Sequence, residues 1–185
     1  MTEDKLIQRA AKGDSRAFDE LLGVHERKMY ALCLRMCGNP DDAQDCLQEA
    51  MLRVFRSLKG FKGDSAFSTW LYRVTMSACL DELRRRKSRP SMSLDTLVEA
   101  GWSPADADPT PEQHAITAQT QVEVQRMISE LGEDMRAAVV LRDIHGCSYE
   151  EIARILGINI GTIKSRISRG REKLREKISA HPELF

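Results

Sequence analysis

The stretch from Cys147 to Ile178 constrains the fold of this chain more than any other segment. Ser148 and Glu151 have the spacing of a capping box, in which each side chain binds a backbone N–H at the start of a helix. Gly157 then suits the left-handed conformation that ends many helices. Asn159 is a good cap for a second helix. This pattern predicts two short helices joined by a tight turn.

The second of these helices has one apolar face and one basic face. Its apolar positions recur at helical spacing and are Ile160, Ile163, Ile167, Leu174 and Ile178. No acid occurs between Ile152 and Arg171, so the opposite face is polar and basic. Such a basic face, called here the front of the helix, suits the DNA major groove. A helix pair that is merely exposed to solvent would normally carry acids on this face as well. We predict base-edge contacts from Thr162, Lys164, Ser165, Arg166 and Arg169.

Most of the remaining chain also has helical periodicity. Aromatic residues make up only 5% of the chain, and strand-like runs are scarce. Helices are expected at residues 3–12, 15–37, 40–58, 65–87, 122–131 and 134–144. In the third of these, the positions expected to face inward are Leu47, Met51, Val54, Phe55 and Leu58. The predicted fold class is all-α.

A change of composition divides the chain into two parts. Residues 88–112 are rich in Ser, Pro, Asp, Ala and Gly, and residues 91–121 contain five acids and no Lys or Arg. Such a segment is typical of an extended connection rather than a core element. We therefore predict two small helical domains, residues 1–89 and 116–185, joined by an acidic flexible linker over residues 90–115 that permits many relative orientations.

Two segments resemble a known family. DDAQDCLQEAMLRVFRSLKGF (41–61) and FSTWLYRVTMSACLDELRRRK (67–87) resemble region 2 of extracytoplasmic-function sigma factors, the promoter-reading subunits of bacterial RNA polymerase. LRDIHGCSYEEIARILGINIGTIKSRISRGREKLR (141–175) resembles their region 4. The resemblance implies a four-helix region 2 domain followed by a helix-turn-helix region 4 domain. The chain departs from the usual pattern at Ser77, where the family has Asn, and at Asn159, where Pro is frequent.

The resemblance also implies partners for each domain. The first domain would bind the clamp of core RNA polymerase through Asp42, Asp45, Gln48 and Glu49. It would recognise and melt the −10 element of promoter DNA through Phe61, Lys62, Ser65, Trp70, Arg73, Arg84 and Arg85. The second domain would read the −35 element and contact the polymerase flap. An anti-sigma factor is the implied regulator.

Three of these assignments have structural alternatives that the sequence leaves open. Trp70 has the spacing of a core residue. The basic run 84–87 suits a solvated helix end, because cations stabilise the C-terminal end of the helix dipole. The cluster Asp41, Asp42 and Asp45 similarly suits the first turns of a helix.

Other functional classes find little support in the residues. Five cysteines at irregular spacing do not form a disulfide framework, and Cys33, Cys37 and His25 lack the spacing of a structural zinc site. No catalytic grouping, P-loop or dinucleotide fingerprint occurs. We expect no enzyme activity, no cofactor, no metal and no small-molecule substrate. With no leader-like or membrane-spanning apolar run, we expect a cytoplasmic protein without direct membrane insertion.

Two alternative functions remain to be compared with a sigma factor. A free-standing helix-turn-helix regulator would need a sensing or dimerising N-terminal half. This half shows neither the βα alternation of a receiver domain nor room for a large ligand pocket. A protein that uses both domains only to bind other proteins would leave the acid-free front of residues 152–171 unexplained.

Overall fold

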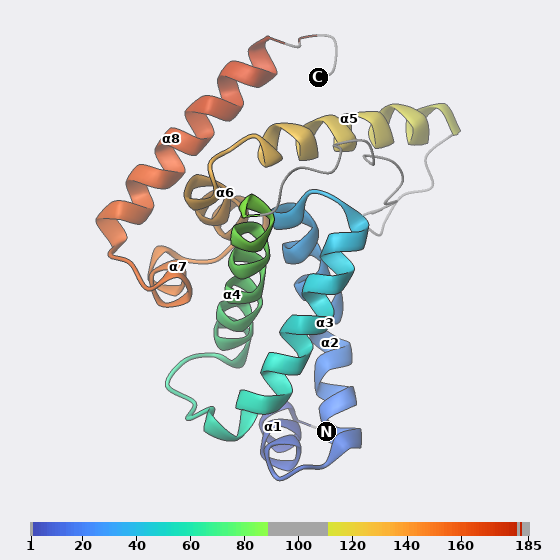
Figure 1. Ribbon diagram of the computed structural model, residues 1–185, viewed down its shortest axis with the longest axis vertical. Helices are drawn as coiled ribbons and strands as arrows, with labels where there is room; N and C mark the ends of the chain where they lie inside the picture. Colours follow the sequence, from blue (N-terminus) through green and yellow to red (C-terminus); the bar gives the residue numbers. More distant parts are fainter. Residues whose placement is uncertain (1, 89–110, 181, 183–185) are drawn as a thin grey trace.

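The computed structural model describes residues 2–88, 111–180 and 182, with the backbone alone described over 111–119. Every regular element in these ranges is helical (Figure 1), which confirms the all-α prediction. The first group is α1 (Glu3–Ala11), α2 (Ser15–Cys37), α3 (Pro40–Ser57), the 3-10 turn η1 (Leu58–Gly60) and α4 (Phe67–Lys87). The second is α5 (Pro111–Ser129), α6 (Glu133–Val139), the π-helical turn η2 (Val140–Ile144), α7 (Tyr149–Leu156) and α8 (Ile160–Ser179).

The predicted linker falls mainly outside the described part of the chain. Of its residues 90–115, those up to 110 are not described, and α5 begins at Pro111. No helix in the described ranges is long and apolar enough to cross a membrane.

Polar caps define the ends of the N-terminal helices. The Asp14 carboxylate accepts a hydrogen bond from the Ala17 N–H (3.1 Å) and so caps α2. Gly38 ends the same helix at a φ of 88°, a left-handed conformation that glycine adopts without a steric cost. Asn39 then accepts a hydrogen bond from the Asp42 N–H (3.0 Å) and caps α3. These caps place α2 and α3 side by side in opposite directions, with α4 packed against both.

The C-terminal group depends on a close approach between α6 and α8. Gly170 of α8 is buried, and a Cβ atom placed there would lie only 2.6 Å from Cγ2 of Val139 in α6. Val139 is itself buried and is held in one rotamer by its β-branched side chain. The contact therefore requires glycine at this position.

We predict that Gly170→Ala destabilises the C-terminal group by roughly 1–2 kcal/mol, because overpacking outweighs the better helix propensity of alanine. The check is urea unfolding followed by circular dichroism, with Gly161→Ala as the control. Gly161 lies on the same helix, where a new Cβ would meet only the Asn159 side chain, at 3.3 Å. Equal or greater stability of Gly170→Ala would contradict this packing.

The two helical groups pack against each other. Helix α7 lies against α4, and α2 contacts α5, α6 and η2 (Figure 1). The buried Arg136 of α6 donates hydrogen bonds to the carbonyl oxygens of Met36 (2.6 Å), Leu131 (3.1 Å) and Ser129. It thereby joins the C-terminal end of α2 to the end of α5, where backbone carbonyls lack helical partners.

Candidate nucleic-acid interface

The helix-turn-helix has the local structure that its sequence predicts. Ser148 and Glu151 form the reciprocal capping box, with N···O distances of 3.1 Å and 2.8 Å. Gly157 ends α7 at a φ of 68°. The Asn159 side chain accepts a hydrogen bond from the Thr162 N–H (2.8 Å) and starts α8. These caps fix where α8 begins and therefore which side chains it presents.

The polar front of α8 faces solvent, but some of its side chains have partners within the protein. Lys164, Ser165 and Arg169 are exposed. Arg166 forms an ion pair with Asp134 of α6 (2.8 Å), and its side chain is only 26% exposed. The Thr162 hydroxyl donates to the Asn159 carboxamide oxygen (3.0 Å). Lys164 lies over the Tyr149 ring (5.6 Å), and the Ser165 hydroxyl donates to the Gly161 carbonyl (3.0 Å). A base edge would reach these exposed side chains and Arg169 from solvent, whereas Arg166 would first have to release Asp134.

The start of α4 carries an aromatic cluster. Ring centroids lie 5.3 Å apart for Phe61 and Trp70 and 5.6 Å apart for Phe67 and Trp70. Trp70 is 7% exposed, so in this arrangement the indole belongs to the core, and Phe61 is half-buried beside it. Lys62 and Arg73 are exposed on either side of this cluster, and Ser65 is half-buried with its hydroxyl directed to the Ala66 carbonyl (3.3 Å).

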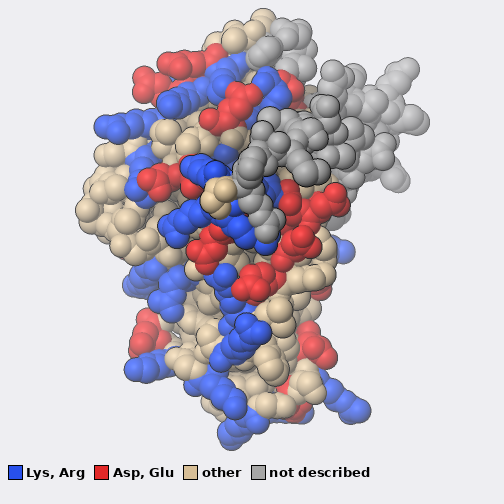
Figure 2. Space-filling model, viewed as in Figure 1, with Lys and Arg blue, Asp and Glu red and all other residues tan. Residues whose placement is uncertain are grey.

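The basic end of α4 is paired with acids one turn earlier. Arg84 lies 3.5 Å from Asp81, and Arg85 lies 2.5 Å from Glu82. Both arginine side chains are more than half exposed, so the surrounding water leaves such pairs weak. They can exchange their carboxylate partners for phosphates at small cost. Basic and acidic side chains are likewise interspersed over the upper half of the face in Figure 2.

Helix α3 presents an acidic strip with apolar neighbours. Asp45 and Gln48 are exposed, Glu49 pairs with Arg53 (2.7 Å), and Asp42 pairs with Arg86 of α4. Further along the same helix, the side chains of Leu52 and Phe55 are 50% and 57% exposed.

The position of Phe55 corrects the inward orientation expected from its periodicity, because its ring rests edge-on against Phe18 at the surface (5.2 Å). Leu52 was not among the predicted site residues. Exposed apolar side chains beside charged ones are typical of protein-binding surfaces. The α3 surface, defined here as Asp42, Asp45, Gln48, Glu49, Leu52 and Phe55, therefore suits a protein partner.

His145 lies where the two helical groups meet. Its Nδ1 atom is 3.2 Å from the Tyr72 hydroxyl of α4, and the two rings pack edge to face. Burial, together with the positive charges of Lys28 and Arg35, lowers the pKa of His145 to about 4. The imidazole is therefore neutral at physiological pH.

This environment predicts that the packing between the groups weakens in acid. A histidine that is exposed has a pKa near 6.5, so between pH 6.5 and about 4 the opened chain binds a proton that the packed chain does not. The stabilisation is complete above pH 6.5 and is lost toward pH 4, by roughly 3 kcal/mol. Urea unfolding from pH 7 to pH 4 measures it, and His145→Gln should flatten the profile. An unchanged profile in the variant would contradict the prediction.

Comparisons with known proteins match both groups of helices. The family model for sigma-70 region 2 matches residues 21–89, and the model for sigma-70 region 4 matches residues 121–174. The ECF RNA polymerase sigma factor SigW of Bacillus subtilis is 36% identical, covering 94% of this chain and 95% of its own length. The RNA polymerase sigma-H factor of Pseudomonas aeruginosa is 36% identical, with 93% and 91% covered.

A solved structure has the same fold. The sigma factor RpoE of Bartonella quintana, in complex with the anti-sigma factor NepR, superimposes with a TM-score of 0.71 at 23% identity, covering 88% of this chain and 96% of that one. The fold and the two matched regions define a sigma-70-type sigma factor. Within that class, the chain belongs to the extracytoplasmic-function family, whose members are initiation factors and not enzymes.

Proposed function

We propose that this chain binds core RNA polymerase in the cytoplasm and directs it to promoters through two separate DNA contacts. The observation that carries this proposal is the presence, in one chain and in family order, of the α3 surface and of the exposed basic front of α8. In a free-standing regulator the α3 surface would serve for dimerisation instead.

The α3 surface is the proposed contact with the polymerase clamp. Its acids attract a basic partner and set the orientation of the encounter, while Leu52 and Phe55 supply apolar area that becomes buried on binding. The second domain is proposed to contact the polymerase flap. The two contacts would hold the domains at the spacing of the promoter elements.

The loop before α4 and both ends of that helix form the proposed −10 contact. Lys62, Arg73, Arg84 and Arg85 are exposed and would bind phosphates of the melted strand. Trp70 is buried beneath Phe61, so its role in this arrangement is to support the loop Phe61–Ser65, which would hold an unstacked base. Binding through these cations should weaken steeply with salt.

The front of α8 is the proposed −35 reader. Here we predict that Arg166→Ala weakens binding to the cognate −35 site by about 10- to 100-fold, as expected for a lost base-edge contact. Asp134→Ala is the matched control, because it removes the ion pair but keeps Arg166. Fluorescence anisotropy of the complex with core polymerase, on cognate and scrambled duplexes, measures both. Equal weakening on the two duplexes would show that Arg166 contacts only phosphate.

An anti-sigma factor is the proposed regulator. The Bartonella relative has this fold and is bound to such a partner. In our structure α7 and His145 already cover part of α4, including Tyr72 and also Thr69, whose hydroxyl donates to Glu151 (3.3 Å). A partner that stabilises this packed arrangement would keep the covered part of α4 from DNA.

Size-exclusion chromatography with sigma-free core polymerase tests the proposal against the free-standing regulator. Co-elution with core, and specific promoter binding only in the complex, are expected. Specific binding to duplex DNA by the chain alone, without co-elution, would favour the regulator.

A further inference from the structure

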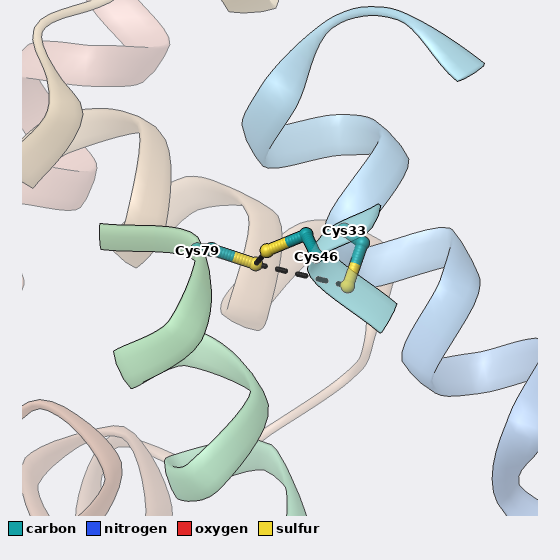
Figure 3. Close-up of side chains that lie close together, drawn as sticks. All are labelled: Cys33, Cys46 and Cys79. Carbon is teal, nitrogen blue, oxygen red and sulfur yellow. Dashed lines mark hydrogen bonds between the residues drawn. The ribbon is translucent and has the colours of Figure 1, made fainter. Parts of the chain in front are cut away.

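Three cysteine sulfurs converge in the core of the first helical group. Cys33 of α2, Cys46 of α3 and Cys79 of α4 point toward one another (Figure 3). The Sγ atoms of Cys46 and Cys79 are 3.5 Å apart, those of Cys79 and Cys33 are 3.8 Å apart, and all three lie within 4.8 Å of one another. Each residue is at most 3% exposed. Within the described residues, no other group of potential metal ligands converges in this way.

We propose that Cys33, Cys46 and Cys79 bind a soft thiophilic metal ion of the Zn²⁺ or Cu⁺ class. An ion in the plane of the three sulfurs and equidistant from them would lie at most about 2.4 Å from each, close to the roughly 2.3 Å of a zinc–thiolate bond. The sulfurs therefore need only small rotations to coordinate. Thiolate donors without oxygen ligands select zinc and cuprous ions over magnesium or calcium.

Metal binding at this cluster requires deprotonation of its thiols. The three cysteines are free thiols whose sulfurs lie within hydrogen-bonding distance in two pairs. Coordination forms three metal–sulfur bonds and displaces three thiol protons to water. No electron is transferred.

A fourth sulfur lies one turn further along α2. Cys37 is buried and follows Cys33 by four residues, so the two thiols lie on the same side of α2. The nearby Arg86 is the positive charge that would partly offset an anionic thiolate centre. Zn²⁺ would recruit Cys37 to complete a tetrahedral site, whereas Cu⁺ is satisfied by three thiolates.

The ligands come from three helices, so the spacing rules for structural zinc sites do not detect them. A bound ion would cross-link α2, α3 and α4 and stabilise the first helical group. This inference does not depend on promoter recognition, and its test needs neither DNA nor polymerase. Because the sulfurs are buried, the ion would enter during folding or local opening.

The experiment is anaerobic refolding of the full chain with and without Cd²⁺, Zn²⁺ or Cu⁺. Cd²⁺ is the spectroscopic probe, because its bonds to thiolates give an ultraviolet charge-transfer band. We expect one ion per chain after gel filtration and a Tm increase on the order of 10 °C at saturation. Comparison of the Zn²⁺ and Cu⁺ experiments shows which ion the site prefers. If Zn²⁺ binds most tightly and Cys37→Ala weakens its binding, the site has four thiolate ligands. If Cu⁺ binds most tightly and Cys37→Ala leaves its affinity unchanged, the site has three.

Cys79→Ala and Cys46→Ala should lower the affinity at least 10-fold, while Cys147→Ala should not. Cys147 is the matched control because it is also buried but lies in the other helical group. If a cluster variant fails to fold, alkylation of the wild type decides: bound metal should protect Cys33, Cys46 and Cys79 but not Cys147. Absence of stoichiometric binding, binding retained in the folded Cys79→Ala, or formation of a Cys46–Cys79 disulfide in place of metal binding would overturn the proposal.

Discussion

Asp45→Arg is expected to weaken binding of the chain to core RNA polymerase by about 100-fold or more, because like charges placed across an interface cost several kcal/mol. Asp45 is exposed in the first half of α3, so the substitution disturbs no packing within the chain. Binding is measured by fluorescence with labelled core polymerase, and transcription from a cognate promoter should fall in parallel.

Asp4→Arg is the matched control for this prediction. Asp4 is exposed on α1, which packs against α2 and η1 at the far end of α3 from Asp45 (Figure 1). Asp4→Arg makes the same change of charge as Asp45→Arg, but at a position outside the α3 surface. Leu52→Ala should weaken binding as well, by removing apolar area without any change of charge. Wild-type affinity in Asp45→Arg, or an equal loss in Asp4→Arg, would exclude the α3 surface as the clamp contact.

Arg136→Leu is expected to have the largest effect on stability, lowering the free energy of unfolding by roughly 3–5 kcal/mol. The leucine leaves the carbonyl oxygens of Met36, Ser129 and Leu131 without their charged donor in a buried place. Because Met36 belongs to α2 and the other two belong to the C-terminal group, the packing between the groups should also loosen.

Urea unfolding measures the first effect, and small-angle scattering measures the second as an increase in the radius of gyration. Arg126→Leu is the control, since Arg126 is paired with Glu123 and Glu130 at the surface and its loss should leave stability nearly unchanged. If both variants unfolded like the wild type, the bonds of Arg136 would not hold the two groups together.

The sequence was sufficient to predict those features of the structure that depend on a few neighbouring residues. The capping box at Ser148, the turn at Gly157 and the cap at Asn159 each depend on a few neighbouring residues, and all three are confirmed. Together with helix periodicity, these three features predicted which side of α8 faces away from the core.

Features that depend on contacts between distant residues were not predictable in this way. Phe55 lies at the surface against Phe18 near the start of α2, whereas periodicity alone directs its ring inward. The burial of Trp70 was one of two open alternatives. The hydrogen bonds of Arg136 join helices that are far apart in the chain. The same is true of the cluster formed by Cys33, Cys46 and Cys79. No short sequence pattern predicts either feature.

The central claim, that this chain makes core polymerase specific for promoters, is tested most directly by run-off transcription. The purified chain is added to sigma-free bacterial core polymerase with genomic fragments as template. We predict new, discrete transcripts that require both components, whose start sites identify the promoter. If no such transcripts appear and the chain binds duplex DNA specifically without polymerase, the claim is contradicted and the free-standing regulator replaces it.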